Sequence, residues 1–363
     1  MHAEAAYLFR HALVRDAAYE LQPPGEREGL HELAADVMRG VFADALGPVA
    51  HEIADHLRAG GRRPGLEREF TRRAAKFAHG NYNHDVAIRL LLRVTEIGET
   101  NEVAEAHQLL YGTLRAHRND LVGARRHALA LWRAGRRSGR PAVAAQALNM
   151  LAGLESRRRA ERLLTRSFRL AASVEGWLAA AIALGNLGAL YAQQKDHRRA
   201  VRLFRRSISL HRRAQNPVGI GFFLCSVAGQ LRHMGDLPGA SQAVEQGVAI
   251  LEEIGAKRYL PTAYGRQAEV LDAQGRFEES ERLLAKAEQL ATEIQLHREW
   301  WKLKIHRALV ALERAEPEEA LSHWHAVQAW LRENGVAAEI EEVRAELRRA
   351  STRLELLPEA SWD

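Results

Sequence analysis

Residues 184–204 of this chain read LGNLGALYAQQKDHRRAVRLF, and this stretch decides the fold. An apolar segment ends near Tyr191, a polar turn follows at residues 195–197, and a second segment begins with the small residue Ala200. Within both segments the apolar side chains recur every three or four residues, which places them on one face of a helix. The stretch therefore predicts two helices joined by a short turn.

The same pattern recurs at a step of 40 residues, and the register holds through five units without an insertion. The position of Gly188 is taken by Leu148, Ala228, Ala268 and Ala308, that of Ala200 by Ala160, Ala240, Ser280 and Ala320, and that of Phe204 by Leu164, Val244, Leu284 and Trp324. Small residues let the two helices of a unit approach closely, and large ones fill the gaps between units. Each hairpin leaves an apolar face that only the next hairpin can cover.

The spacing of Leu, Gly, Tyr, Ala and Phe in residues 184–204 resembles the tetratricopeptide repeat. A period near 40 exceeds the common 34 residues, and it resembles the long, MalT-like arrays of bacterial signalling ATPases. This resemblance implies an all-α fold, a right-handed α-α superhelix with a short helical N-terminal module. A generic helical solenoid without that lineage is the alternative.

Looser units precede the regular ones, and they set the expected domain boundaries. We expect about seven tetratricopeptide-like hairpins over residues 65–335, because the pattern of small and apolar residues extends back to Arg72. Residues 336–363 are expected to form an amphipathic capping helix and a tail, since a solenoid needs a polar end for solubility. Residues 1–64 are expected to form a separate helical segment.

The N-terminal residues 7–20, YLFRHALVRDAAYE, resemble the end of the winged-helix-like module of STAND-class ATPases. Residues 27–34 and 51–60 resemble the helices that follow in that family. The resemblance implies the repeat or sensor arm of a signalling or transcriptional regulator. The motif G-x-x-x-x-G-K-[ST], which cradles phosphates, does not occur in the chain, so ATP hydrolysis is not expected. We therefore expect a fragment, a split subunit or a truncated gene product.

The charge balance leaves two interpretations open. The formal charge is +6 and the pI is about 9.6, with arginine the main basic residue. We favour arginines paired with glutamates on exposed helix faces. The alternative is a nucleic-acid-associated regulator that uses an arginine-rich face of the middle repeats. The runs that would form such a face are Arg157-Arg158-Arg159, Arg198-Arg199, Arg205-Arg206 and Arg212-Arg213.

No constellation in the sequence favours catalysis, a cofactor or a bound metal. His323 and His325 are two residues apart, so on a helix they point to different sides and cannot easily share an ion. Cys225 has no adjacent base that could activate it as a nucleophile. The N-terminus lacks a signal peptide and no apolar run is long enough to cross a membrane. We therefore expect a cytoplasmic protein that is not an enzyme.

Binding is expected in the groove that the first helix of each repeat lines in a tetratricopeptide array. Family geometry places groove residues near the position of Gly188. The expected groove residues in that register are Asn149, Gln193, Arg232, His233, Glu269 and Asp272. Their mixed charges suit a protein or peptide ligand docked by hydrogen bonds and charge pairs, with apolar pockets between. The sequence thus predicts a protein-binding scaffold.

Overall fold

The computed structural model describes residues 19–117, 120–333, 343–345, 347–349 and 352. Within these ranges the chain forms α-helices joined by short turns, so the all-helical prediction is confirmed. Most of the N-terminal stretch 7–20 and most of the expected capping helix and tail, residues 336–363, lie outside the described residues. The chain divides into two compact units, Met1–His127 and Ala128–Asp363.

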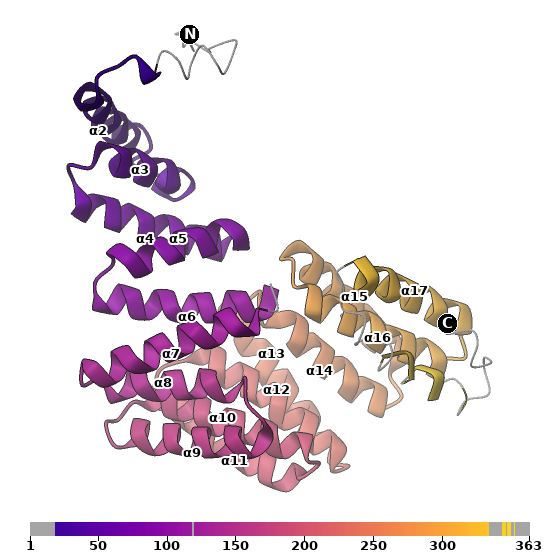
Figure 1. The fold of residues 1–363 in the computed structure, drawn as a ribbon. Helices are drawn as coiled ribbons and strands as arrows, with labels where there is room; N and C mark the ends of the chain where they lie inside the picture. Colours follow the sequence, from indigo (N-terminus) through magenta and orange to yellow (C-terminus); the bar gives the residue numbers. More distant parts are fainter. Residues whose placement is uncertain (1–18, 118–119, 334–342, 346, 350–351, 353–363) are drawn as a thin grey trace. The chain divides into compact units, whose positions relative to one another are not determined.

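The first unit is built from helices that pack in sequence order (Figure 1). Its helices are α2 (Pro24–Val41), α3 (Leu46–Gly60), α4 (Pro64–Gly80), α5 (His84–Ile97) and α6 (Thr100–His117), followed by the start of α7 (Leu121–Arg137). Buried apolar residues from several helices form its core, among them Ile53, Phe70, Leu91 and Leu110. Glu32 on α2 binds the Arg63 side chain, which ties α2 to the turn before α4.

The second unit repeats one hairpin along the chain (Figure 1). Its helices are α8 (Pro141–Ala152), α9 (Arg157–Ala172), α10 (Trp177–Gln193), α11 (His197–Arg213), α12 (Pro217–His233), α13 (Leu237–Glu253), α14 (Leu260–Ala273), α15 (Phe277–Glu293), α16 (His297–Glu313) and α17 (Pro317–Glu333). Consecutive helices pack as pairs, α8 with α9 through to α16 with α17.

The turns keep the 40-residue step in their backbone as well as in their sequence. In the four hairpins from α10–α11 to α16–α17, the turn inside the hairpin contains one residue with a left-handed backbone, and these residues lie one repeat apart. They are Lys195, Gly235, Gly275 and Ala315, with φ of 61°, 80°, 75° and 62°. Because this conformation is favourable mainly for glycine, its persistence at a lysine and an alanine shows that the packing of the helices fixes the turn.

The small positions of the repeat allow close helix packing, as expected. A Cβ on Gly188 would come within 2.7 Å of the Phe204 ring, so only glycine lets α10 and α11 meet there. The residues at the Ala200 position are fully buried in four successive hairpins, including Ser280. Small side chains therefore set the distance between the two helices of each hairpin.

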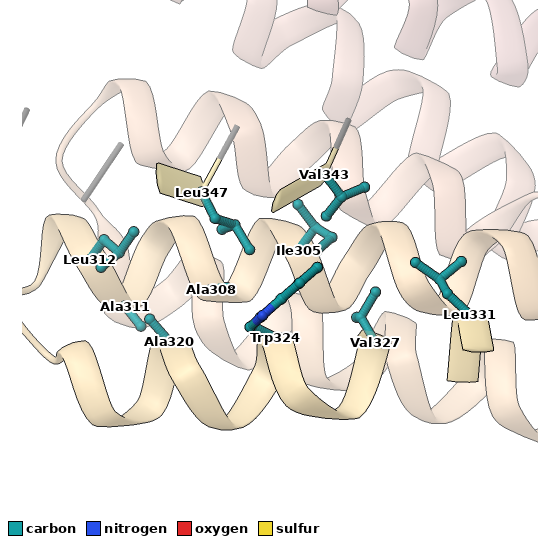
Figure 2. Packing of buried hydrophobic residues seen from close by; sticks show 10 residues of the cluster. All are labelled: Ile305, Ala308, Ala311, Leu312, Ala320, Trp324, Val327, Leu331, Val343 and Leu347. Atoms are coloured by element: carbon teal, nitrogen blue, oxygen red, sulfur yellow. The ribbon is translucent and has the colours of Figure 1, made fainter. Parts of the chain in front are cut away.

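The core of the last described hairpin contains Trp324, the largest fully buried side chain among the described residues. Figure 2 shows its indole pointing from α17 towards Ile305 on α16. Val343 and Leu347, beyond α17, are also buried in this cluster. These two described residues cover part of the apolar face that α16 and α17 leave.

Charged residues replace apolar ones between α15 and α16. Lys304 and Arg307 occupy the register of Leu184 and Leu187. On α15, Glu288 accepts from Lys304 at 2.7 Å and from Arg307 at 2.6 Å, and Glu281 also accepts from Arg307. Burial works to raise the pKa of Glu288, but the two cations outweigh it and the pKa is lowered. Ion pairs thus join these helices where leucines do so earlier in the chain.

Candidate functional site

Three of the predicted groove residues line one pocket in the second unit. The pocket has a volume of about 740 Å³ and lies among α12, α14 and α16. It contains Arg232 from α12 together with Glu269 and Asp272 from α14. We refer to it as the α12–α16 pocket. All three helices are the first helices of their hairpins, and α14 packs against both of the others.

The register explains why these side chains meet. Arg232 and Asp272 are one repeat apart, so they occupy equivalent positions on neighbouring helices. Asn216 caps the start of α12 by accepting from the Gly219 N–H. Arg232 therefore lies in the last turn of a helix whose start is fixed, and it faces the side chains of the next repeat.

Charge pairs link the helices around the pocket. Glu269 accepts from Arg232 at 3.3 Å, and its two oxygens accept from Arg266 at 2.8 and 3.0 Å. Burial favours the neutral form of Glu269, but the positive charges of Arg266 and Arg232 outweigh this and lower its pKa. The carboxylate therefore stays ionised and holds two guanidinium groups at the pocket wall.

A second pair joins α14 to α16. Asp272 Oδ2 lies 2.6 Å from His306 Nε2. The other oxygen, Oδ1 of Asp272, is buried and has no hydrogen-bond partner within the described part of the chain, and the same holds for Nε of Arg232. Buried polar atoms are nearly always hydrogen-bonded in folded proteins. Both atoms lie behind the accessible surface, so a ligand in the pocket would meet the other polar atoms of these side chains.

Apolar side chains complete the pocket. Leu303 and Leu309 from α16 and Pro261 from α14 line it beside the charged groups. A Cβ on Gly265 would lie 3.3 Å from Leu303, so the glycine leaves room above that leucine. The site combines a few oriented polar atoms with an apolar surface, as ligand pockets usually do.

The family model of the MalT-like TPR region matches residues 154–358, which is more than half of the chain. The chain belongs to this family. The match begins just before α9 and includes every residue of the α12–α16 pocket. A search of curated proteins gave no match.

Solved structures share the fold at low identity. A Rap protein complexed with Competence and Sporulation Factor is 12% identical, with a TM-score of 0.62 over 92% of this chain and 94% of that one. NprR in complex with its cognate peptide NprX is 14% identical, with a TM-score of 0.57 over 88% and 92%. A STAND protein with a tetratricopeptide repeat sensor from Pyrococcus horikoshii is 13% identical, with a TM-score of 0.50 over 92% of this chain and 54% of that one. This chain therefore spans about half of that protein, and all three matches establish the TPR fold.

The other predicted groove residues lie elsewhere in the TPR hairpins. His233 is exposed beside the pocket, where its ring stacks on His197 at 4.9 Å, and Gln193 is exposed at the end of α10. Asn149 is only 5% exposed, and its Nδ2 donates to the Ala179 carbonyl at 3.0 Å. The structure thus brings together Arg232, Glu269 and Asp272, while Asn149 links α8 to α10.

The two residues that pair with the pocket carboxylates on α14, Arg266 and His306, were absent from the sequence prediction. They are one repeat apart, so a search for polar residues in a second register would have found both. Their role depends on which carboxylate each one reaches, and that depends on how neighbouring hairpins are packed. The register alone gives no such information.

Other chemistry in the described residues is limited. Cys225 is buried, and burial raises the pKa of its thiol to about 12, so it stays protonated at neutral pH. Among the described residues no three histidine, cysteine or acidic side chains are grouped to hold a metal ion. The described helices also include none that is long and apolar enough to cross a membrane.

Proposed function

We propose that the α12–α16 pocket binds a peptide segment of a partner protein. The observation that carries this proposal is the juxtaposition, in one pocket, of paired charged groups on α12, α14 and α16 with an apolar surface. An extended peptide presents a carbonyl and an N–H at every residue, so it can hydrogen-bond to the accessible atoms of Arg232 and Asp272. Leu303 and Leu309 would then contact an apolar side chain of the same peptide.

The proposal extends to the role of the whole chain. We infer that it is the non-catalytic sensor arm of a STAND-type signalling or transcriptional regulator in the cytoplasm, with an ATPase or output domain as a further partner. The TPR proteins of similar fold are named in complex with Competence and Sporulation Factor and with the peptide NprX, and the STAND protein is named for its repeat sensor. In this proposal residues 65–335 form the array, residues 1–64 link it to the rest of the regulator, and residues 336–363 cap it.

A peptide-display selection tests the pocket assignment. Peptides recovered from a random library on the wild-type chain are titrated by calorimetry against wild type and against the double variant Arg232→Ala/Asp272→Ala. We expect the double variant to lose about tenfold or more in affinity for the main peptide group, because two oriented hydrogen bonds are removed.

The matched control removes the same two kinds of charge from an exposed pair. Glu278 and Arg282 on α15 are 83% and 78% exposed and lie 3.6 Å apart, so Glu278→Ala/Arg282→Ala should leave the affinity unchanged. If every selected peptide binds the pocket variant as tightly as wild type, and its circular dichroism is unchanged, the pocket assignment is wrong.

A further inference from the structure

A second and larger pocket lies between α7 and α9, with α8 at its base. Its volume is about 1320 Å³, and all of its lining residues belong to the second unit. A Cβ on Gly135 would come within 2.6 Å of the Ala144 backbone nitrogen, so this glycine lets α7 approach α8 beneath the pocket. We refer to it as the basic pocket because of the side chains on its wall.

Arginines from one face of α9 form that wall. They are Arg158, Arg162, Arg166 and Arg169, at spacings of four, four and three residues, and all are exposed. Residues at these spacings lie on one side of a helix. The pocket lining contains a single carboxylate, Glu161, and Tyr191 donates a hydrogen bond to it.

These four arginines are unpaired, contrary to our expectation of glutamate partners. Within the described residues none of them has a carboxylate in ion-pair distance. Arg307, by comparison, pairs with two carboxylates. Four guanidinium groups on one wall repel each other and attract an anion, so the wall is complementary to a ligand with several negative charges.

The rest of the lining distinguishes between two kinds of anionic partner. Leu148, Leu170 and Ala144 give the pocket an apolar base, which suits an apolar side chain of a peptide. Sites for single-stranded nucleic acid combine basic grooves with aromatic platforms for the bases. The aromatic ring in this lining, Trp132, has the Arg136 guanidinium carbon over it, 5.3 Å from the ring centroid. The pocket lining therefore has no uncovered aromatic ring on which a base could stack.

We propose that the basic pocket binds an acidic peptide segment of a partner protein. The arginines of α9 receive its carboxylates, which their planar guanidinium groups can bind through two hydrogen bonds each. One apolar side chain of the segment contacts Leu148 and Leu170 at the base. This site is independent of the α12–α16 pocket and shares no lining residue with it.

The test uses two fluorescent probes of equal negative charge, a short glutamate-rich peptide with a central leucine and an oligothymidylate. Their affinities for the full chain are measured by anisotropy, and then for the variant Arg162→Glu/Arg166→Glu. We expect the peptide to bind wild type more tightly than the oligothymidylate does, and to lose about tenfold or more in the variant.

The control changes the charge equally outside the pocket. Arg198 and Arg205 on α11 are exposed and without a carboxylate partner among the described residues, so Arg198→Glu/Arg205→Glu reproduces the change in net charge. We expect this control to weaken the peptide by less than about threefold. Equal losses in the two variants would show a diffuse charge effect and overturn the proposal. An oligothymidylate that binds as tightly as the peptide would overturn it in favour of nucleic acid.

Discussion

The middle and the C-terminal hairpins of the second unit differ in where their basic residues lie and in whether these are paired with carboxylates. Between α9 and α10 the contacts are apolar, with Leu184 and Leu187 buried. The four arginines of α9 that line the basic pocket lie outside, without a carboxylate partner among the described residues. Between α15 and α16, Lys304 and Arg307 lie inside and are paired with carboxylates. One repeat scaffold therefore accepts either leucines or ion pairs at the same register positions.

This difference has a functional consequence for the two pockets. The α12–α16 pocket neutralises its own charges, so a ligand there would be recognised mainly by hydrogen bonds and apolar contacts. In the basic pocket the positive charge of the arginines is not neutralised by the described residues, so a ligand would have to supply the negative charge. Exposed unpaired charges act at a range that salt controls, whereas pairs already formed respond less.

The largest expected effect tests the apolar contact in the middle hairpins. Leu184 is 3% exposed, and Leu184→Ala should lower the free energy of unfolding by about 3 kcal/mol, because it leaves a cavity between α9 and α10. Urea denaturation followed by circular dichroism measures this. The same substitution at Leu178, 43% exposed on the same helix, should cost less than about 1 kcal/mol. Equal losses of unfolding free energy in the two variants would show that buried Leu184 stabilises the fold no more than exposed Leu178 does.

The next effect tests the ionic contact in the C-terminal hairpins. Glu288→Gln removes the carboxylate that Lys304 and Arg307 share, and it should lower the free energy of unfolding by about 2 kcal/mol, because two partly buried cations lose a partner. Glu278→Gln on the exposed face of α15 serves as the control and should have no measurable effect. If Glu288→Gln leaves the free energy of unfolding unchanged, Lys304 and Arg307 are stabilised by water instead of by the carboxylate.

Acid should destabilise both regions. Burial lowers the pKa of His211 in α11 and of His323 in α17 to about 4, from 6.5. The unfolded chain then binds more protons between pH about 4 and 6.5, so the free energy of unfolding falls as the pH falls through that range. At pH 5 each histidine should account for about 1–2 kcal/mol of this loss.

The variants His211→Gln and His323→Gln check the assignment. In urea denaturation at pH 7 and pH 5, each should show a smaller difference between the two pH values than wild type does. His325→Gln, at an exposed position of α17, should keep the wild-type difference. A pH dependence that neither buried variant reduces would place its origin in other groups.

The smallest expected effect concerns the unpaired arginines. Arg162→Gln/Arg166→Gln removes no ion pair among the described residues, so the free energy of unfolding should change by less than about 0.5 kcal/mol. The same urea experiment measures it beside Glu288→Gln. A loss as large as that of Glu288→Gln would show that these arginines stabilise the fold.

Much of the fold could be predicted from sequence because small residues recur at fixed positions. The 40-residue step placed Ala200, Ala240 and Ala320 correctly at buried positions and Phe204 and Trp324 in the core. Packing of this kind depends on side-chain size and register, which the sequence contains. The pairing of Lys304 with Glu288 was not predicted, because it depends on the approach of α16 to α15.

The candidate site was predictable only in part. Asn149 and Glu269 occupy the same register position, yet Asn149 reaches a carbonyl of α10 while Glu269 reaches arginines on α12 and α14. Side-chain length and the neighbouring repeat determine which of these occurs. Of the four arginines on the wall of the basic pocket, the predicted runs contained only Arg158, and part of the base comes from a different helix, α8.

The most direct test of this contrast is the salt dependence of binding at the two pockets of one molecule. The peptide selected on the α12–α16 pocket and the acidic peptide probe are titrated between about 50 and about 200 mM salt. We expect the affinity of the acidic probe to fall steeply with salt and that of the selected peptide to change little. Parallel salt dependences would contradict the account that one pocket neutralises its own charge and the other does not.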